Sequence, residues 1–140
     1  MIDLPVKLKV HDSIFVPLAK WSMLLSGNYR CVKEENAVAI KEAVHSDLVH
    51  SEEIYHWVGA IARKLGAIDS DQVPFDKYAR AAESLIRPSS AARALFSGAK
   101  NIERVDRLIK VIAIQMGEDT HLIDPIIEQV DRRLEINRGS

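Results

Sequence analysis

The chain has 140 residues, of which 47% are hydrophobic, and it carries 19 Lys and Arg against 20 Asp and Glu. This composition predicts a globular fold and excludes a largely disordered chain, while the balanced charge excludes a dedicated nucleic-acid binder. The length suits one domain with its own core. We assign residues 1–138 to that domain and treat Gly139-Ser140 as a candidate cloning remnant.

Cysteine usage and hydropathy narrow the class of protein. Cys31 is the only cysteine, so no internal disulfide and no cluster built on several thiolates can form. A lone cysteine is usually a small core residue. Lys7 and Lys9 interrupt the opening residues before any long apolar run, so we expect no signal peptide. No apolar run approaches the length of a membrane span, and we expect a cytoplasmic protein without membrane contact.

In the first half of the chain, residues 5–10 alternate apolar and polar and predict a short strand or extended arm. Asp12 or Ser13 then caps a helix that ends near residues 27–28. A second helical segment covers about residues 34–49. Ser51 is expected to cap a third helix, which Gly66 ends. The second and third segments could also form one longer helix, and the sequence leaves both possibilities open.

The next part of the chain has clear helix boundaries. Pro74 is expected to open a helix and Pro88 to end it. Ser89 and Ser90 then cap a short helix that runs to about Phe96. Both hydroxyls are therefore expected at a helix start.

The last two helices are marked by a cap and an apolar stripe, and by an Asp-Pro pair. Asn101 is expected to cap the first of them. Its apolar positions form the strongest stripe in the chain: Ile102, Val105, Leu108, Ile109, Ile112 and Ala113. Asp124 followed by Pro125 predicts an N-cap and a first helical residue. Six or seven helices with almost no strand predict a single all-α domain.

Two Glu-x-x-His patterns could belong to a metal site. They are Glu53 with His56 and Glu118 with His121. Paired patterns of this kind hold two metal ions in ferritin-like helix bundles. The second pattern follows Gly117 and falls in an expected loop, where the i, i+3 geometry is not guaranteed. We therefore favour coincidence and assign no metal site.

The glycines of the chain form neither a dinucleotide-binding fingerprint nor a phosphate-binding loop. Both motifs need closely spaced glycines beside the start of a helix. We therefore expect that this chain alone binds no nucleotide cofactor.

Five polar residues remain as candidates for a ligand site: Lys20, Asn28, Ser89, Ser90 and Glu103. Lys20 and Asn28 are about two helical turns apart and would share one helix face. The serines and Glu103 are expected at the starts of two successive helices, where hydroxyls, a carboxylate and free N–H groups could bind a polar or anionic small molecule. Each residue taken singly also has a structural explanation as a surface lysine, a helix-ending residue, a cap or a favourable helix-end charge.

In combination these residues resemble the C-terminal helical domain of the ketopantoate reductase family, which is similar to the C-terminal domain of 6-phosphogluconate dehydrogenase. Lys20 and Asn28 match a Lys and the second of two Asn residues on the first helix of that domain. Leu24 stands where the first Asn would be. An alternative register anchored on Trp21 puts Met23 at the Lys position.

The resemblance continues in the second half of the chain. The serine pair at 89–90 resembles the serine pair at a helix start in the family. Residues 103–106, Glu-Arg-Val-Asp, resemble the Glu-Ile-Asp run that opens its long helix. The Asp-Pro pair at 124–125 resembles the beginning of its last helix. The likeness follows the helix order over nearly the whole chain.

This resemblance implies a role for each matched residue. Lys20 and Glu103 would assist hydride transfer from NADPH to a 2-keto acid, while Asn28, Ser89 and Ser90 would bind the substrate. A cationic lysine can polarise and protonate a ketone oxygen, and a carboxylate with hydroxyls can orient a hydroxyl of the substrate. The implied enzyme is an NADP-dependent 2-keto acid reductase.

The Rossmann domain that binds the cofactor in this family is not part of the sequence, and one wall of an interdomain cleft cannot transfer hydride alone. We therefore expect a substrate-binding and dimerisation domain, not catalytic alone, that pairs with a second copy or with a Rossmann-domain partner. Two alternatives stay open, because fold likeness does not decide function. One is a helical interaction or scaffold protein, and the less favoured one is a metal-binding helix bundle.

Overall fold

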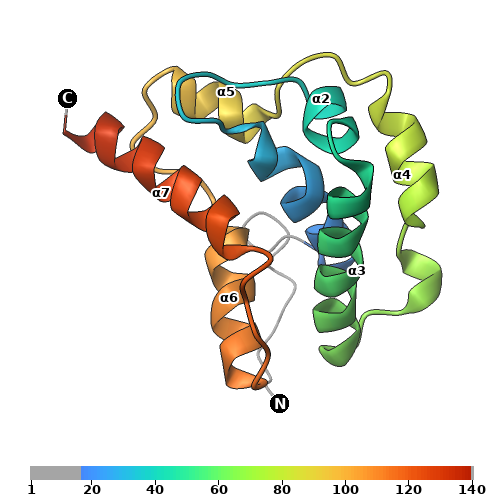
Figure 1. Ribbon diagram of the computed structural model, residues 1–140. Coiled ribbons are helices and arrows are strands. Elements are labelled where there is room, and N and C mark those ends of the chain that lie inside the picture. The colour runs from blue at the N-terminus through green and yellow to red at the C-terminus, as the bar shows by residue number, and fades with distance from the viewer. Residues whose placement is uncertain (1–16, 140) are drawn as a thin grey trace.

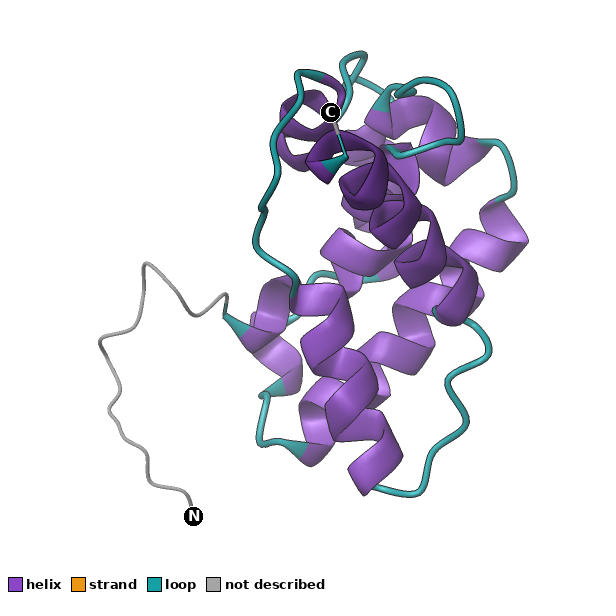
Figure 2. Ribbon diagram, turned by 90° about the vertical axis from the view of Figure 1, so that its left-hand side faces the viewer, coloured by secondary structure: helices purple, strands orange, loops and turns teal. Residues whose placement is uncertain are grey.

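The computed structural model describes residues 17–139 and confirms the all-α prediction for them (Figure 1, Figure 2). The α-helices in this range are α1 Trp21–Met23, α2 Ile40–His45, α3 Leu48–Lys64, α4 Phe75–Ala82, α5 Ser90–Phe96, α6 Val105–Gln115 and α7 Asp124–Arg138. One isolated β-bridge, Val32 with Ala37, is the only strand-type pairing in residues 17–139. The arm expected at residues 5–10 and the cap expected at Asp12 or Ser13 lie outside the described residues.

The helix predicted to end near residues 27–28 continues further and changes its winding. A 3₁₀ turn, Leu18–Lys20, precedes α1, and a π-helical turn, Leu24–Asn28, follows it. A second 3₁₀ turn, Tyr29–Cys31, completes the segment. This segment lies at the centre of the molecule, with α3 on one side and α6 and α7 on the other (Figure 1).

The main core surrounds this central segment. Its largest fully buried side chains come from α1, α3, α5, α6 and α7 and the residues beside them: Trp21, Leu25, Ile54, Ile61, Leu95, Ile109, Ile123 and Val130. Removing these apolar side chains from water is the main force that holds the helices together. Cys31 is buried in the same cluster, as expected for a lone cysteine.

A second apolar cluster joins α4 to α2 and α3. The rings of Tyr55 and Tyr78 stack with centroids 5.5 Å apart, and Phe75 packs edge-on against Tyr55 at 5.3 Å. His45 is half-buried at the end of α2, and its Nε2 donates to the carbonyl of Ala79 over 2.7 Å. These contacts hold α4 on the outer face of α3 (Figure 1).

Several helix boundaries agree with the sequence prediction. Gly66 and Gly117 follow the C-terminal ends of α3 and α6 with φ of +106° and +80°, a backbone conformation that glycine adopts without strain. Ser89 caps α5, since its hydroxyl accepts from the N–H of Ala92 at 3.2 Å. Pro74 directly precedes α4, as predicted.

The prediction of one helical segment over residues 34–49 is wrong for the first part of that range. The N–H of Lys33 donates to the carbonyl of Asn36, and the N–H of Val38 donates to that of Cys31. These bonds close a turn, so α2 begins only at Ile40.

The start of α3 also differs from the prediction. Asp47 is its cap, because the Asp47 carboxylate accepts from the N–H of His50 at 3.1 Å. Ser51 lies inside the helix and is buried, and its hydroxyl donates to the carbonyl of Val44 over 2.7 Å. The second and third predicted segments are therefore two separate helices, α2 and α3.

Two later boundaries are shifted. We expected Asn101 to cap the sixth helix, but α6 begins at Val105 and residues 101–104 form a loop. We expected Asp124 to be an N-cap, but it is the first residue of α7. Its carboxylate accepts from the Thr120 hydroxyl at 3.0 Å, so it is engaged by the preceding turn.

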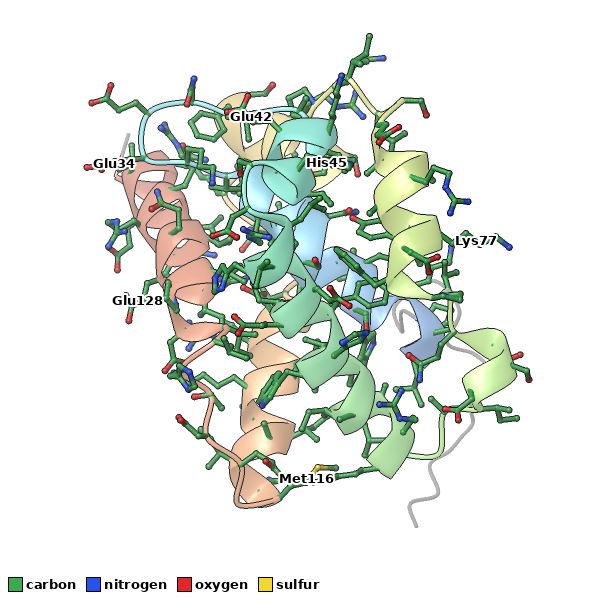
Figure 3. All side chains as sticks on the ribbon, turned by 45° about the vertical axis from the view of Figure 1, so that its right-hand side comes forward. Glu34, Glu42, His45, Lys77, Met116 and Glu128 are labelled. Carbon is green, nitrogen blue, oxygen red and sulfur yellow. The ribbon has the colours of Figure 1, made fainter. Side chains whose placement is uncertain are left out.

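Most charged side chains point away from the helices into solvent. Glu34, Lys77 and Glu128 are examples, and all three project outward from the ribbon (Figure 3). No helix within residues 17–139 combines the length and the hydrophobicity that a bilayer span requires.

Candidate functional site

Three of the five candidate residues line one cavity of about 300 Å³. Asn28 comes from the π-helical turn, Ser90 from the start of α5, and Glu103 from the loop before α6. Leu24 and Ile102 supply apolar surface to the same cavity. The fold thus brings together polar groups that are far apart in sequence, which is the usual make-up of a small-molecule site.

The π-helical turn sets the position of Asn28. Its defining hydrogen bond runs from the N–H of Tyr29 to the carbonyl of Leu24. Such turns insert one extra residue into a helix and are frequent at functional sites. Gly27 makes the turn fit its surroundings, because a Cβ there would lie 2.0 Å from the Tyr78 hydroxyl oxygen.

The two serines have different roles in the structure. Ser89 is buried, and its hydroxyl donates to the carbonyl of Asn28 over 2.8 Å while it caps α5. Ser90 is exposed and lines the cavity. Ser89 therefore holds the start of α5 against the π-helical turn, and Ser90 is the serine that a ligand in this cavity would meet.

Glu103 is exposed, and its backbone is tied to the core by a residue that the sequence did not single out. The hydroxyl of Tyr29 donates to the carbonyl of Glu103 over 2.6 Å and accepts from the N–H of Val105 at 3.0 Å. Burial, followed by the nearby charge of Asp106, raises the pKa of Tyr29 to about 12, so its hydroxyl stays protonated at neutral pH. No sequence pattern marks this bond.

Lys20 is not brought into this cavity. It is exposed at the end of the first 3₁₀ turn and is not among the lining residues. Leu24, which does line the cavity, is four residues later and lies on about the same side of the segment. Lys20 is thus about one turn away from the cavity along that segment.

A second cavity of about 400 Å³ lies next to the first, and both are lined by Asn28 and Ser90. Arg87 and Arg93 also line it, and Ile40 contributes apolar surface. Glu103 lines only the first cavity and the two arginines line only the second. The hollow as a whole therefore carries a carboxylate on one side and cations on the other.

An ion-pair network stabilises the loop that carries Glu103. Arg104 donates two hydrogen bonds of 2.9 Å to Asp106, whose side chain is fully buried. Arg104 also donates to Asp131 of α7 over 2.7 Å, and Arg107 donates to the same carboxylate over 2.8 Å. Asp106 belongs to the Glu-Arg-Val-Asp run, and its contacts are structural.

The two Glu-x-x-His patterns do not form a metal site in the part of the chain that is described, where no group of three or more potential ligands is placed to hold a metal ion. Glu118 pairs with Lys64, and His121 pairs with Asp119 at 2.7 Å. His56 lies 3.9 Å from Glu52 within α3. The metal-bundle alternative has no geometric support in these residues.

The described glycines with a positive φ are not placed as in a phosphate-binding loop. Gly66, Gly98 and Gly117, which have positive φ, each follow a helix instead of preceding one. The backbone N–H groups of a nucleotide-binding loop would have to precede a helix.

Comparison of the chain with protein-family models, with curated proteins and with solved structures finds no match.

Proposed function

We propose that this chain is the substrate-binding and dimerisation domain of a ketopantoate-reductase-like, NADP-dependent oxidoreductase that acts on a 2-keto acid. The observation that carries the proposal is the shared cavity of Asn28, Ser90 and Glu103. The family resemblance singles out these residues by type and spacing, independently of their positions in space. Their convergence from three separate segments on one hollow is what a substrate site of this kind requires.

The chemistry of the cavity suits a small hydroxylated keto acid. The Glu103 carboxylate can accept a hydrogen bond from a substrate hydroxyl, while the Asn28 amide and the Ser90 hydroxyl can donate to its oxygens. Arg87 or Arg93, on the other side of Asn28, can pair with the substrate carboxylate. Lys20 would protonate the ketone oxygen only if a partner domain closed over this face, since the lysine lies outside the cavity.

The cofactor belongs to a separate Rossmann domain in this proposal. NADPH would supply the hydride there, and this chain would bind and orient the substrate. We therefore expect that the 140-residue chain alone does not bind NADPH measurably. A micromolar dissociation constant by calorimetry would contradict this part of it.

The test is binding of ketopantoate to the isotope-labelled chain, followed by NMR. We expect saturable shifts of the Asn28 and Ser90 signals, and a loss of affinity of about tenfold or more in E103Q, because a charged acceptor is lost. The matched control is E34Q, which removes the same charge from an exposed side chain that points into solvent (Figure 3). Equal affinity in E103Q and wild type, or no saturable shift at all, would overturn the proposal.

A second candidate function, a helical interaction protein, is favoured by one observation on α6. Its outer side carries large apolar side chains that are well exposed: Leu108 at 40%, Val111 at 54% and Ile114 at 56%. Apolar side chains gathered on one helix surface are typical of an interface. This candidate and the first are compatible if the surface is where the domain associates.

A further inference from the structure

A third hollow, distant in sequence from the candidate site, lies where α3 meets the chain leading into α4. It has a volume of about 260 Å³. Its polar lining includes His56, Arg63, Asp69 and Gln72, and its apolar lining includes Pro74 and Phe75. None of these residues lines the cavity of Asn28, Ser90 and Glu103. A ligand in this hollow is therefore independent of the proposed function.

Two polar groups of this hollow converge above Gly59. A Cβ atom on Gly59 would lie 3.4 Å from the Gln72 amide oxygen, 3.4 Å from the Ser22 hydroxyl oxygen and 3.5 Å from Nη1 of Arg63. Gly59 sits inside α3 and is buried, where alanine would favour the helix more. The missing side chain thus leaves open the point at which the amide and the guanidinium meet.

The side-chain amide nitrogen of Gln72 lacks a hydrogen-bond partner. Its Nε2 is the one buried side-chain nitrogen or oxygen without a partner among residues 17–139. Leaving a buried donor unpaired costs free energy, so such a group calls for an explanation. The amide oxygen is the Gln72 atom that faces Gly59, and because the terminal torsion of a glutamine side chain is broad and roughly two-fold, a half-turn exchanges the two atoms and directs an N–H toward an acceptor above Gly59.

Arg63 is also only loosely engaged. Its Nε lies 3.8 Å from the carboxylate of Asp69, whose side chain is 84% exposed. That distance is longer than a charge-assisted hydrogen bond of about 2.8 Å. The guanidinium can therefore bind a carboxylate in the bidentate geometry that arginine prefers.

Rings and apolar side chains also line the hollow. The rings of His56 and Phe75 are in edge-to-face contact, with centroids 6.5 Å apart. Val73 and Pro74 complete this side. Aromatic edges and faces of this kind favour a planar apolar partner over a hydrated ion.

We propose that this hollow is a binding site for a small carboxylate that has a planar apolar body. The carboxylate lies above Gly59, where it accepts hydrogen bonds from Arg63 and Gln72. The planar body packs against His56 and Phe75. The volume restricts the ligand to a small molecule, since pockets for larger ligands begin at about 300 Å³.

The test uses sodium benzoate as the probe, titrated into the isotope-labelled full chain and followed by NMR. We expect saturable shifts of the Gly59 backbone amide and the Gln72 side-chain amide. Benzamide, which has the same shape without the charge, should cause no saturable shift. The signals of Asn28 and Ser90 should stay unchanged, so the result is independent of ketopantoate binding.

Three variants test whether the hollow binds benzoate specifically or holds only a water molecule. G59A places a methyl group where the carboxylate would lie, and alanine suits the helix, so it should abolish benzoate binding in a folded protein. R63Q should weaken binding about tenfold or more. K64Q is the matched control, since Lys64 has the same 48% side-chain exposure as Arg63 and does not line the hollow.

The proposal is overturned by any of four results. The first is that benzoate causes no saturable shift at millimolar concentration. The second is that benzoate binds G59A as tightly as wild type, and the third is that R63Q and K64Q lower the affinity for benzoate equally. A crystal structure of the benzoate-soaked protein with only a water beside Gln72 would also overturn it. A carboxylate between Arg63 and Gln72 in that structure would establish the site directly.

Discussion

Tyr29 and Glu103 are separated by 74 residues, and the side-chain hydroxyl of the first donates a 2.6 Å hydrogen bond to the backbone carbonyl of the second. The same hydroxyl accepts from the N–H of Val105, the first residue of α6. One phenol therefore fixes both the loop that carries Glu103 and the start of the helix after it. Because Tyr29 comes directly after Asn28, it also links both sides of the candidate cavity.

This relationship predicts the effect of Y29F. The variant keeps the buried ring but leaves the N–H of Val105 and the carbonyl of Glu103 without their partner. We expect a loss of about 1–3 kcal/mol in the free energy of unfolding, the usual cost of a buried unsatisfied group. Urea unfolding measures the loss, and hydrogen exchange should show a less protected Val105 amide.

The matched control is Y55F. Tyr55 also donates its hydroxyl to a backbone carbonyl, that of Val73, but on the α4 side of the molecule. Y55F should lower stability and leave the exchange of the Val105 amide unchanged. Equal protection of that amide in Y29F and wild type would contradict the role we assign to Tyr29.

A second prediction concerns Asp106, which is fully buried and receives two hydrogen bonds from Arg104. D106N removes the charge and leaves Arg104, with a side chain 17% exposed, paired only with Asp131. Breaking a buried pair from one side costs about 3–5 kcal/mol. We expect D106N to lower the free energy of unfolding by about 3 kcal/mol, the lower end of this range, because Asp131 still pairs with Arg104.

R107Q is the comparison for D106N in the same network. Arg107 is bonded to Asp131 but its side chain is 58% exposed, so its removal should cost no more than about 1 kcal/mol. Chemical unfolding of both variants tests the difference. If D106N and R107Q lost the same stability, the buried pair of Arg104 and Asp106 would contribute no more than the exposed pair of Arg107 and Asp131.

The sequence could predict that helices form and roughly where most of them end. Periodic apolar residues, Pro74, Gly66 and Gly117 act locally, and their effects appear in the structure as expected. The start of α6 could not be predicted this way. Asn101 is a good cap by residue type, but Tyr29 holds the N–H of Val105 and the helix begins there.

The faces of α6 were equally hard to predict. Its sequence is apolar at nearly every position that is not charged, so the period alone does not say which stripe is inward. The stripe predicts Leu108 in the core, but Leu108 is 40% exposed, while Ile109 and Ala113 are fully buried. The packing of the central segment and of α7 selects the inner face, and that packing is a property of the whole fold.

The candidate site was partly predictable. Asn28, Ser90 and Glu103 could be proposed from their residue types and from a family likeness, and they do share a cavity. The separate role of Ser89 could not be foreseen, because it depends on a bond to the carbonyl of Asn28. The π-helical turn has no simple sequence signal either.

A third prediction is an acid-dependent loss of stability through Asp131. Burial raises its pKa, but hydrogen bonds and charges from Arg104 and Arg107 outweigh this and hold the pKa below the ordinary value of an aspartate. The pKa of Asp131 is about 3.9 in the unfolded chain and lower in the fold. Its stabilisation is therefore complete above the unfolded pKa and is lost as pH falls through the folded pKa.

We expect the free energy of unfolding to decline below about pH 4, and D131N to flatten this decline. Chemical unfolding across a pH series measures it. The control is D119N, because a hydrogen bond with His121 also lowers the pKa of Asp119, but that residue is fully exposed. D119N should flatten the decline less than D131N does, because solvent screens an exposed pair, and identical profiles for D131N and wild type would count against the assignment.

The last prediction is that the chain associates through the outer side of α6. Val111 and Ile114 are more than half exposed there and line a hollow between α6 and α7. Large apolar surfaces on soluble proteins are commonly covered by a second copy or a partner. A lysine at position 111 would have to lose its hydration inside such an interface, and the nearby carboxylates of Glu128 and Asp131 offset this cost only in part, so V111K should dissociate the assembly. Light scattering and sedimentation measure it, and V49K is the control because Val49 on α3 is 72% exposed and lies outside this hollow. A wild-type chain that stays monomeric at high concentration, or a V111K variant that still assembles, would exclude α6 as a self-association surface.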